Sequence, residues 1–147
     1  MKLHHDRIDV YVIDGHDKNT SGKRSFKFAD ESEIIENDYN EPLADEVVRL
    51  FKQDPKFRVT YVTPEDTFRS IANRANVVNL DYEKRGSRFD RAICISVHAN
   101  AFGKKWNNAN GTEALYYEGC KTGKKFATII SKKISNVYGI RNRGAKP

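Results

Sequence analysis

The sequence predicts an α/β layered sandwich with a mostly parallel, twisted sheet flanked by helices. Three observations carry this prediction. Short β-branched runs alternate with longer segments of helical periodicity, the runs end in turn or polar residues, and no linker rich in Pro, Gly or Ser divides the chain. The chain has 147 residues, the size of one ordinary domain, so we expect one domain over residues 1–147.

Four strands are expected, at residues 8–13, 57–62, 92–97 and 112–117. The first stops at Asp14 and Gly15, a pair typical of turns. The run 92–97 is apolar apart from Ser96, which predicts a central, largely buried strand. Cys94 lies within that run, so we expect a buried thiol.

Three helices are expected, from about 38–40 to 51, from about 67 onwards and from about 123 to 138. Their spacing predicts three buried apolar faces, which are Leu43, Val47, Leu50 and Phe51; Phe68, Ile71, Ala72, Ala75 and Val78; and Phe126, Ile129, Ile130, Ile134 and Val137. Asp66 is the expected N-cap of the second helix, and Gly139 is the expected C-cap of the third. The stretch 16–38 is polar and reads as a long loop, a kind of segment that often carries function.

The formal net charge is +6, from 26 Lys and Arg against 20 Asp and Glu, which suggests an anionic partner. The basic residues are spread along the chain and no known nucleic-acid motif is present, so we expect no nucleic-acid binding. No apolar run approaches the ~18 residues of a membrane helix. The start of the chain has no apolar segment of the kind found in signal peptides. Two cysteines are too few for a disulfide framework.

Two histidines follow strands of the predicted sheet. His16 comes after the first strand, and His98 closes the strand 92–97. In open α/β sheets, ligands bind beyond the carboxyl ends of the strands, so the two imidazoles would face one site if these strands are neighbours. Two histidines and one carboxylate form a common catalytic zinc set. Spacing leaves the acid open among Glu31, Glu33, Glu36, Asp38 and Glu41.

Five segments resemble the zinc-dependent N-acetylmuramoyl-L-alanine amidases, and among them the catalytic domains of phage endolysins. They are the first histidine motif at 12–16, the following loop at 19–25, the glutamate motif at 36–40, the Arg-x-Asn stretch at 74–76 and the second histidine motif at 95–101. The stretch 106–113 also resembles the family's Asn-Gly-x-Glu entry to a strand. The second histidine motif is the most specific of these matches.

The resemblance implies that His16, Glu36 and His98 are zinc ligands. It implies hydrolysis of the amide bond between N-acetylmuramic acid and L-alanine in peptidoglycan, with a second glutamate on a final strand as general base. No Asp or Glu follows Glu118 in this chain. We therefore expect that the last strand and its glutamate lie beyond Pro147, that the chain is C-terminally truncated, and that it is inactive as it stands if nothing replaces that base. Glu113 is the substitute within the chain, although fixing a neighbouring strand is the expected role for it.

Asn100 and Asn110 are candidate substrate contacts, and Asp17 is a candidate hydrogen-bond partner of a ligand imidazole. A basic stretch at 84–91 could contact anionic wall polymers. Arg74 is expected to be a structural ion-pair partner. We expect an endolysin that is made in the host cytoplasm and acts on the cell wall after release. The alternative is a zinc-containing wall-binding module without catalysis.

Overall fold

The computed structural model describes residues 7–16, 20, 23–64, 70–86, 91–100, 103 and 105–147. The chain divides into two compact units, Met1–Ala101 and Phe102–Pro147, and each is described by itself. The first contains β1 (Ile8–Asp14), α1 (Glu36–Lys52), β2 (Phe57–Tyr61), α2 (Ile71–Lys84) and β3 (Ala92–Val97). The second contains β4 (Thr112–Leu115), α3 (Lys121–Tyr138) and β5 (Asn142–Lys146).

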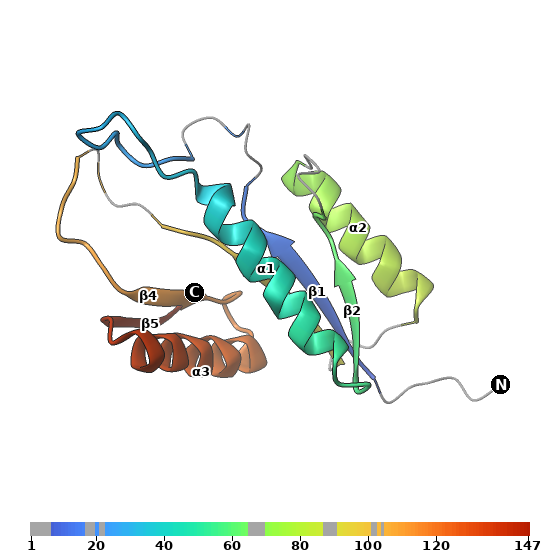
Figure 1. The fold of residues 1–147 in the computed structure, drawn as a ribbon. Helices are drawn as coiled ribbons and strands as arrows, with labels where there is room; N and C mark the ends of the chain where they lie inside the picture. Colours follow the sequence, from blue (N-terminus) through green and yellow to red (C-terminus); the bar gives the residue numbers. More distant parts are fainter. Residues whose placement is uncertain are drawn as a thin grey trace. The chain divides into compact units, whose positions relative to one another are not determined.

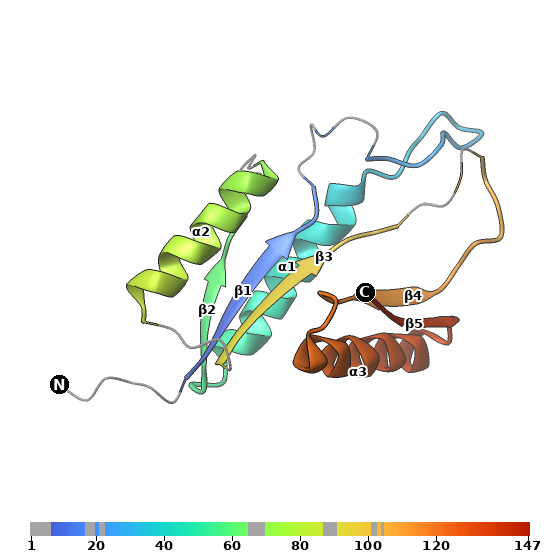
Figure 2. The ribbon, with the colours of Figure 1, turned by 180° about the vertical axis from the view of Figure 1, so that it is seen from behind.

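The sheet of the first unit has the strand order β2-β1-β3, and both pairs are parallel. Figures 1 and 2 show α1 lying along one face of this sheet. Val10 and Val12 of β1 pack there against Ala44 and Val48 of α1, and all four side chains are buried. This apolar layer fixes the helix on the sheet, so the carboxyl ends of the strands and the first turn of α1 come to the same end of the unit.

On the opposite face of β1, ion pairs and hydrogen bonds between side chains connect the strand to its neighbours. Alternate residues of a strand point to opposite faces, so Asp9 points away from α1. Its buried carboxylate accepts from Arg58 of β2 at 2.5 and 2.8 Å, and Arg85 at the end of α2 reaches it at 3.3 Å. Asp81 of α2 accepts from Thr60 of β2 at 3.0 Å. This network connects α2 to the sheet through polar contacts.

β3 differs from its prediction. It lies at an edge of the three-stranded sheet, and β1 is the central strand. Along β3 half-buried and exposed residues occur, and none is buried. Cys94 is exposed, so the expectation of a buried thiol is wrong. An apolar run marks a strand, but it does not say which strand receives neighbours on both edges.

The predicted helical faces are also corrected. In α1 the buried stripe contains Ala44 and Val48. Of the predicted face, Val47 and Phe51 are partly buried against this core, while Leu43 and Leu50 are about half exposed. In α2 no described residue is buried and Ile71 is 87% exposed, because this helix meets the sheet through the ion network. Its predicted N-cap Asp66 and face residue Phe68 lie outside the described residues, and Ser70 is the observed N-cap.

The second unit is a strand–helix–strand arrangement in which β4 and β5 pair in parallel, with an irregularity between Thr112 and Glu113. The predicted C-cap Gly139 adopts the left-handed conformation at φ 63°. The five apolar residues expected to face inward on α3 are exposed, and Ala127 and Ser131 are buried instead. Small side chains allow the helix to approach the two strands closely, and a two-stranded ribbon covers only a narrow stripe of it.

The predicted fold class is confirmed, since helices flank sheets whose paired strands are all parallel. β5 was not predicted as a strand, because the segment 138–147 was interpreted as the lead-in to one. Among the described residues, no helix is long and apolar enough to cross a membrane. The single-domain organisation of residues 1–147 stays a prediction.

Candidate metal centre

His16 and His98 meet at the carboxyl edge of the first sheet. His16 follows β1 after one glycine, and His98 follows β3 directly. β1 and β3 are parallel neighbours with Asp14 opposite Val97, so both strands deliver their next residues to the same end. The two ring centroids are 5.0 Å apart and the ring planes are inclined by 73°. The prediction that the two imidazoles face one site is therefore confirmed.

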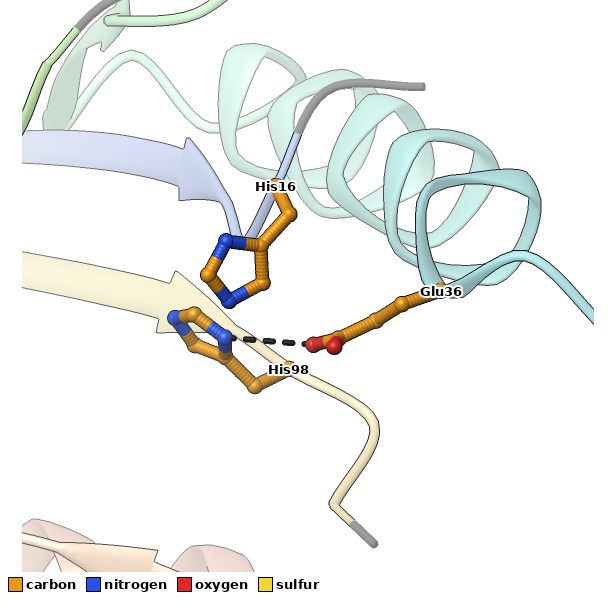
Figure 3. A group of neighbouring side chains, drawn as sticks. All are labelled: His16, Glu36 and His98. Carbon is orange, nitrogen blue, oxygen red and sulfur yellow. Dashed lines mark hydrogen bonds and ion pairs between the residues drawn. The ribbon is translucent and has the colours of Figure 1, made fainter. Parts of the chain in front are cut away.

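Glu36 supplies the carboxylate. It is the first residue of α1 and only 9% exposed, and an acid is favourable in the first turn of a helix. Its Oε1 lies 3.3 Å from Nδ1 of His98, and one ligand atom from each of the three side chains lies within 4.8 Å of the others. Figure 3 shows the three side chains converging from β1, β3 and α1. Within the described residues, this is the single cluster of this kind.

The other acids near α1 are engaged elsewhere or point away. Glu31 pairs with Lys27, and Glu33 pairs with Arg24. Asp38 is exposed, and Glu41 accepts from Asn37. The tertiary structure thus selects Glu36 from the five acids that spacing left open.

The cluster fits a zinc ion. Two imidazoles and one carboxylate are donors that zinc accepts, with room for a further ligand. Imidazole binds a metal in its neutral form. Desolvation by burial lowers the pKa of His16, with smaller contributions of the same sign from Lys23, His98 and Arg74, while Glu36 acts in the opposite direction. The protein therefore favours the form of His16 that can bind a metal.

Neighbouring groups orient the donors. Oε1 of Glu36 accepts from the Ala99 backbone N–H at 3.1 Å and from Asn40 Nδ2 at 3.2 Å. Ser96 Oγ lies 3.0 Å from Nε2 of His98, which leaves Nδ1 of that ring facing Glu36. These roles of Asn40 and Ser96 were not predicted from the sequence. Their spacing could have predicted these contacts, since Asn40 is one helical turn after Glu36 and Ser96 shares a strand face with His98.

The backbone that leads to His16 is braced from two sides. Arg74 of α2 donates from Nη1 to the carbonyl oxygens of Asp14 at 2.9 Å and Gly15 at 2.5 Å. Thr63 Oγ1 accepts from the Asp14 backbone N–H at 3.1 Å. These bonds give Arg74 a positioning role beside a donor, and its ion-pair role stays a prediction.

Residue 15 must be glycine, because its surroundings leave no room for a side chain. A Cβ at this position would lie 2.6 Å from Asn40 Nδ2, from His98 Nδ1 and from the Val97 carbonyl oxygen. Such contacts are far shorter than side chains tolerate. The absence of a side chain at residue 15 is what allows β1, β3 and α1 to close around the site.

The remaining candidates lie elsewhere. Asn100 is exposed, two residues after His98. Asn110 belongs to the second unit, where its Nδ2 donates to the Asn108 carbonyl at 3.0 Å. Glu113 of β4 pairs with Arg143 at 3.0 Å and Lys146 at 2.5 Å, both on β5. Asp17 lies outside the described residues, as do parts of the loop 19–25 and of the basic stretch 84–91.

A sequence profile described as N-acetylmuramoyl-L-alanine amidase matches residues 10–147. The chain belongs to this family. The matched range includes all three donors of the candidate centre. No curated protein matches the chain.

Solved structures of amidases have the same fold. The N-acetylmuramoyl-L-alanine amidase of Clostridium difficile 630 is 23% identical with a TM-score of 0.76, and the match covers 96% of this chain and 69% of that one. The catalytic domain of CwlV from Bacillus (Paenibacillus) polymyxa var. colistinus is 28% identical with a TM-score of 0.70, covering 95% and 69%. The amidase AmiC2 of Nostoc punctiforme is 24% identical with a TM-score of 0.68, covering 93% and 67%.

Proposed function

We propose that the chain is a zinc-dependent N-acetylmuramoyl-L-alanine amidase that hydrolyses the bond between N-acetylmuramic acid and L-alanine in peptidoglycan. The observation that carries the proposal is the convergence of His16, Glu36 and His98 in a chain of this family. When bound there, zinc supplies Lewis-acid chemistry, which polarises the amide carbonyl and lowers the pKa of water.

The side chains of the centre would bind the zinc ion, and their neighbours would orient them. Two neutral imidazoles and the Glu36 carboxylate would bind the ion, and the bonds from Ala99 and Asn40 would keep that carboxylate in place. Asn100, exposed beside His98, is proposed to contact the substrate. Asn110 is proposed as a second contact.

The general base is proposed to be a glutamate beyond Pro147, as the resemblance implies. Glu113 is a poor substitute because its carboxylate is held by two cations of β5. Those pairs connect β4 to β5, which supports the strand-fixing role named in the sequence analysis. A chain extended by the codons that follow Pro147 tests the assignment. A glutamate there whose replacement by Gln removes hydrolysis would support it, whereas full hydrolysis by the extended Glu→Gln chain would exclude it.

The test of the function uses purified cell walls, the extended chain and added zinc. We expect the release of L-alanine amino groups, measured by amine labelling, and its loss after a chelator has removed the metal. Cys94→Ala is the matched control, because Cys94 is exposed and lies outside the donor cluster. Undiminished release by the metal-free protein would overturn the zinc mechanism.

The second candidate is a zinc-containing wall-binding module without catalysis. The observation that favours it is that Glu113, the substitute base named from the sequence, is held in ion pairs with Arg143 and Lys146. Wall pull-down without amine release, also with the extended chain, would select this function. The endolysin setting, synthesis in the host cytoplasm and contact with anionic wall polymers are further parts of the proposal, supported by the resemblance and the charge of +6.

A further inference from the structure

A basic pocket lies on the second unit, where the loop before β4 meets the start of β5. Its cavity of about 390 Å³ is lined by Asn108, Ala109, Asn110, Arg141, Asn142, Arg143 and Lys146. Six of these seven side chains are polar, with Ala109 as the exception, and three of the six are cations. In the part of the chain that the structure describes, no acid lines the cavity.

The charge of the pocket is not balanced by its neighbours. Glu113 pairs with Arg143 and Lys146, so one carboxylate stands against three cations and two positive charges remain in excess. Among the described residues, no side-chain partner of Arg141 is found. Such a guanidinium can bind a carboxylate through two parallel hydrogen bonds.

The walls of the pocket are held in place by the backbone. The Thr112 N–H donates to the Arg141 carbonyl at 2.9 Å, and a Cβ on Gly111 would lie 2.4 Å from that same oxygen. Gly111 has φ 111°, which favours glycine. Asn142 Oδ1 accepts from the Gly144 N–H at 2.9 Å. The loop and β5 therefore form a prebuilt concave surface.

We propose that this pocket binds a short acidic peptide through its carboxylate, which places a carboxylate of the peptidoglycan stem peptide there. The identity of the peptide rests on the proposed function. The volume lies in the range of sites for multi-atom ligands and exceeds what one small anion fills. Asparagine amides both donate and accept, as the amide groups of a peptide require. Arg141 would hold the carboxylate, and Asn108 and Asn110 would contact the flanking amides.

The test measures binding to the zinc-loaded 147-residue chain by calorimetry and by amide chemical shifts. The probes are the dipeptide L-alanyl-D-glutamate, its diamide and inorganic phosphate. We expect the dipeptide to shift amide signals of Asn108, Asn110 and Arg141, and the diamide to bind at least about tenfold more weakly. Phosphate should bind more weakly than the dipeptide.

Arg141→Gln should weaken dipeptide binding about tenfold or more. Lys133→Gln is the matched control, because it removes the same charge from an exposed position of α3 in the same unit, and it should change the affinity less than twofold. Circular dichroism of both variants separates a loss of binding from a loss of folding. Where Arg141→Gln does not fold, Asn108→Ala replaces it, with a weakening of at least about threefold expected.

Equal binding of the dipeptide and its diamide, or unchanged binding by a folded Arg141→Gln, would overturn the proposal. Tighter binding of phosphate would also overturn it, and would indicate a site for phosphate groups. His98→Ala separates this proposal from the proposed function. Dipeptide binding that survives in that variant supports the pocket whatever the wall assay gives, and wall hydrolysis without dipeptide binding removes the pocket alone.

Discussion

The metal centre and the basic pocket are two polar sites suited to ligands of opposite charge. The centre in the first unit gathers two imidazoles and a carboxylate within 4.8 Å and lowers the pKa of His16 by desolvation. The pocket in the second unit gathers three cations around an open cavity. The first is suited to a metal cation, and the second to an anion.

The two sites are also supported differently. Each donor of the centre is fixed by a strand end or a helix start, and Arg74 and Thr63 brace the backbone beside His16. The pocket depends on a loop that contacts β5 through Gly111. A cation site needs its donors at defined positions, whereas an anion site tolerates long, exposed side chains. Substitutions at the centre should therefore cost more than those at the pocket, and each set should leave the other site intact.

The largest effect is expected from His98→Ala. It removes a donor, so bound zinc should fall from about one ion per chain to background, and wall hydrolysis by the extended chain should fall with it. Metal analysis after dialysis checks the first expectation. Cys94→Ala should retain both properties. Full zinc content in the His98 variant would disprove the assignment of this donor.

The second-largest effect is expected from Gly15→Ala. The new Cβ would lie 2.6 Å from His98 Nδ1 and from Asn40 Nδ2, so we expect about 1–3 kcal/mol of lost stability and at least about tenfold weaker zinc binding. Gly86→Ala is the control, since nothing lies within 4 Å of that position and only its φ of 60° opposes the change. It should cost about 1 kcal/mol and leave zinc binding unchanged. Thermal melts and zinc titration measure both, and equal zinc affinity in the two variants would contradict the close-packing argument.

Arg74→Gln should weaken zinc binding by roughly 10–100-fold, because the two carbonyls beside His16 lose their donor. Arg49→Gln removes the same charge from an exposed pair with Glu46 and should change stability by less than about 0.5 kcal/mol. Competition with a chromogenic chelator gives the affinities. If both variants bind zinc like the parent chain, Arg74 has no positioning role.

Ser96→Ala should have the smallest effect, about tenfold in zinc affinity, because the His98 ring keeps Glu36 as a partner while losing a contact at Nε2. Ser32→Ala, an exposed serine bonded to Asp30, is the control and should have no effect. Histidine side-chain NMR of the zinc-loaded chain adds a readout of ring orientation. An unchanged ring spectrum in Ser96→Ala would show that the hydroxyl does not orient His98.

The fold and most of the site could be predicted from the sequence. β1, β2 and β3 begin where their apolar runs begin, and the motifs around His16, Glu36 and His98 predicted the three side chains that the structure brings together. What failed were statements about burial. Periodicity placed an apolar face on α2, yet Ile71 is 87% exposed. A face is buried only where another element covers it, and periodicity does not name that element.

The sequence by itself determined the α/β class, the strand-end histidines and the family resemblance, because these depend on local pattern and on short motifs. Only the tertiary structure decided that β1 is central and that Asn40, Ser96 and Arg74 support the cluster. It also brought Glu36, the acid that the resemblance implied, close to both histidines. It also brought the loop 108–111 to the start of β5 and so created the basic pocket. These features join residues far apart in the chain, and the parallel pairing of β1 with β3 and of β4 with β5 is what places them together.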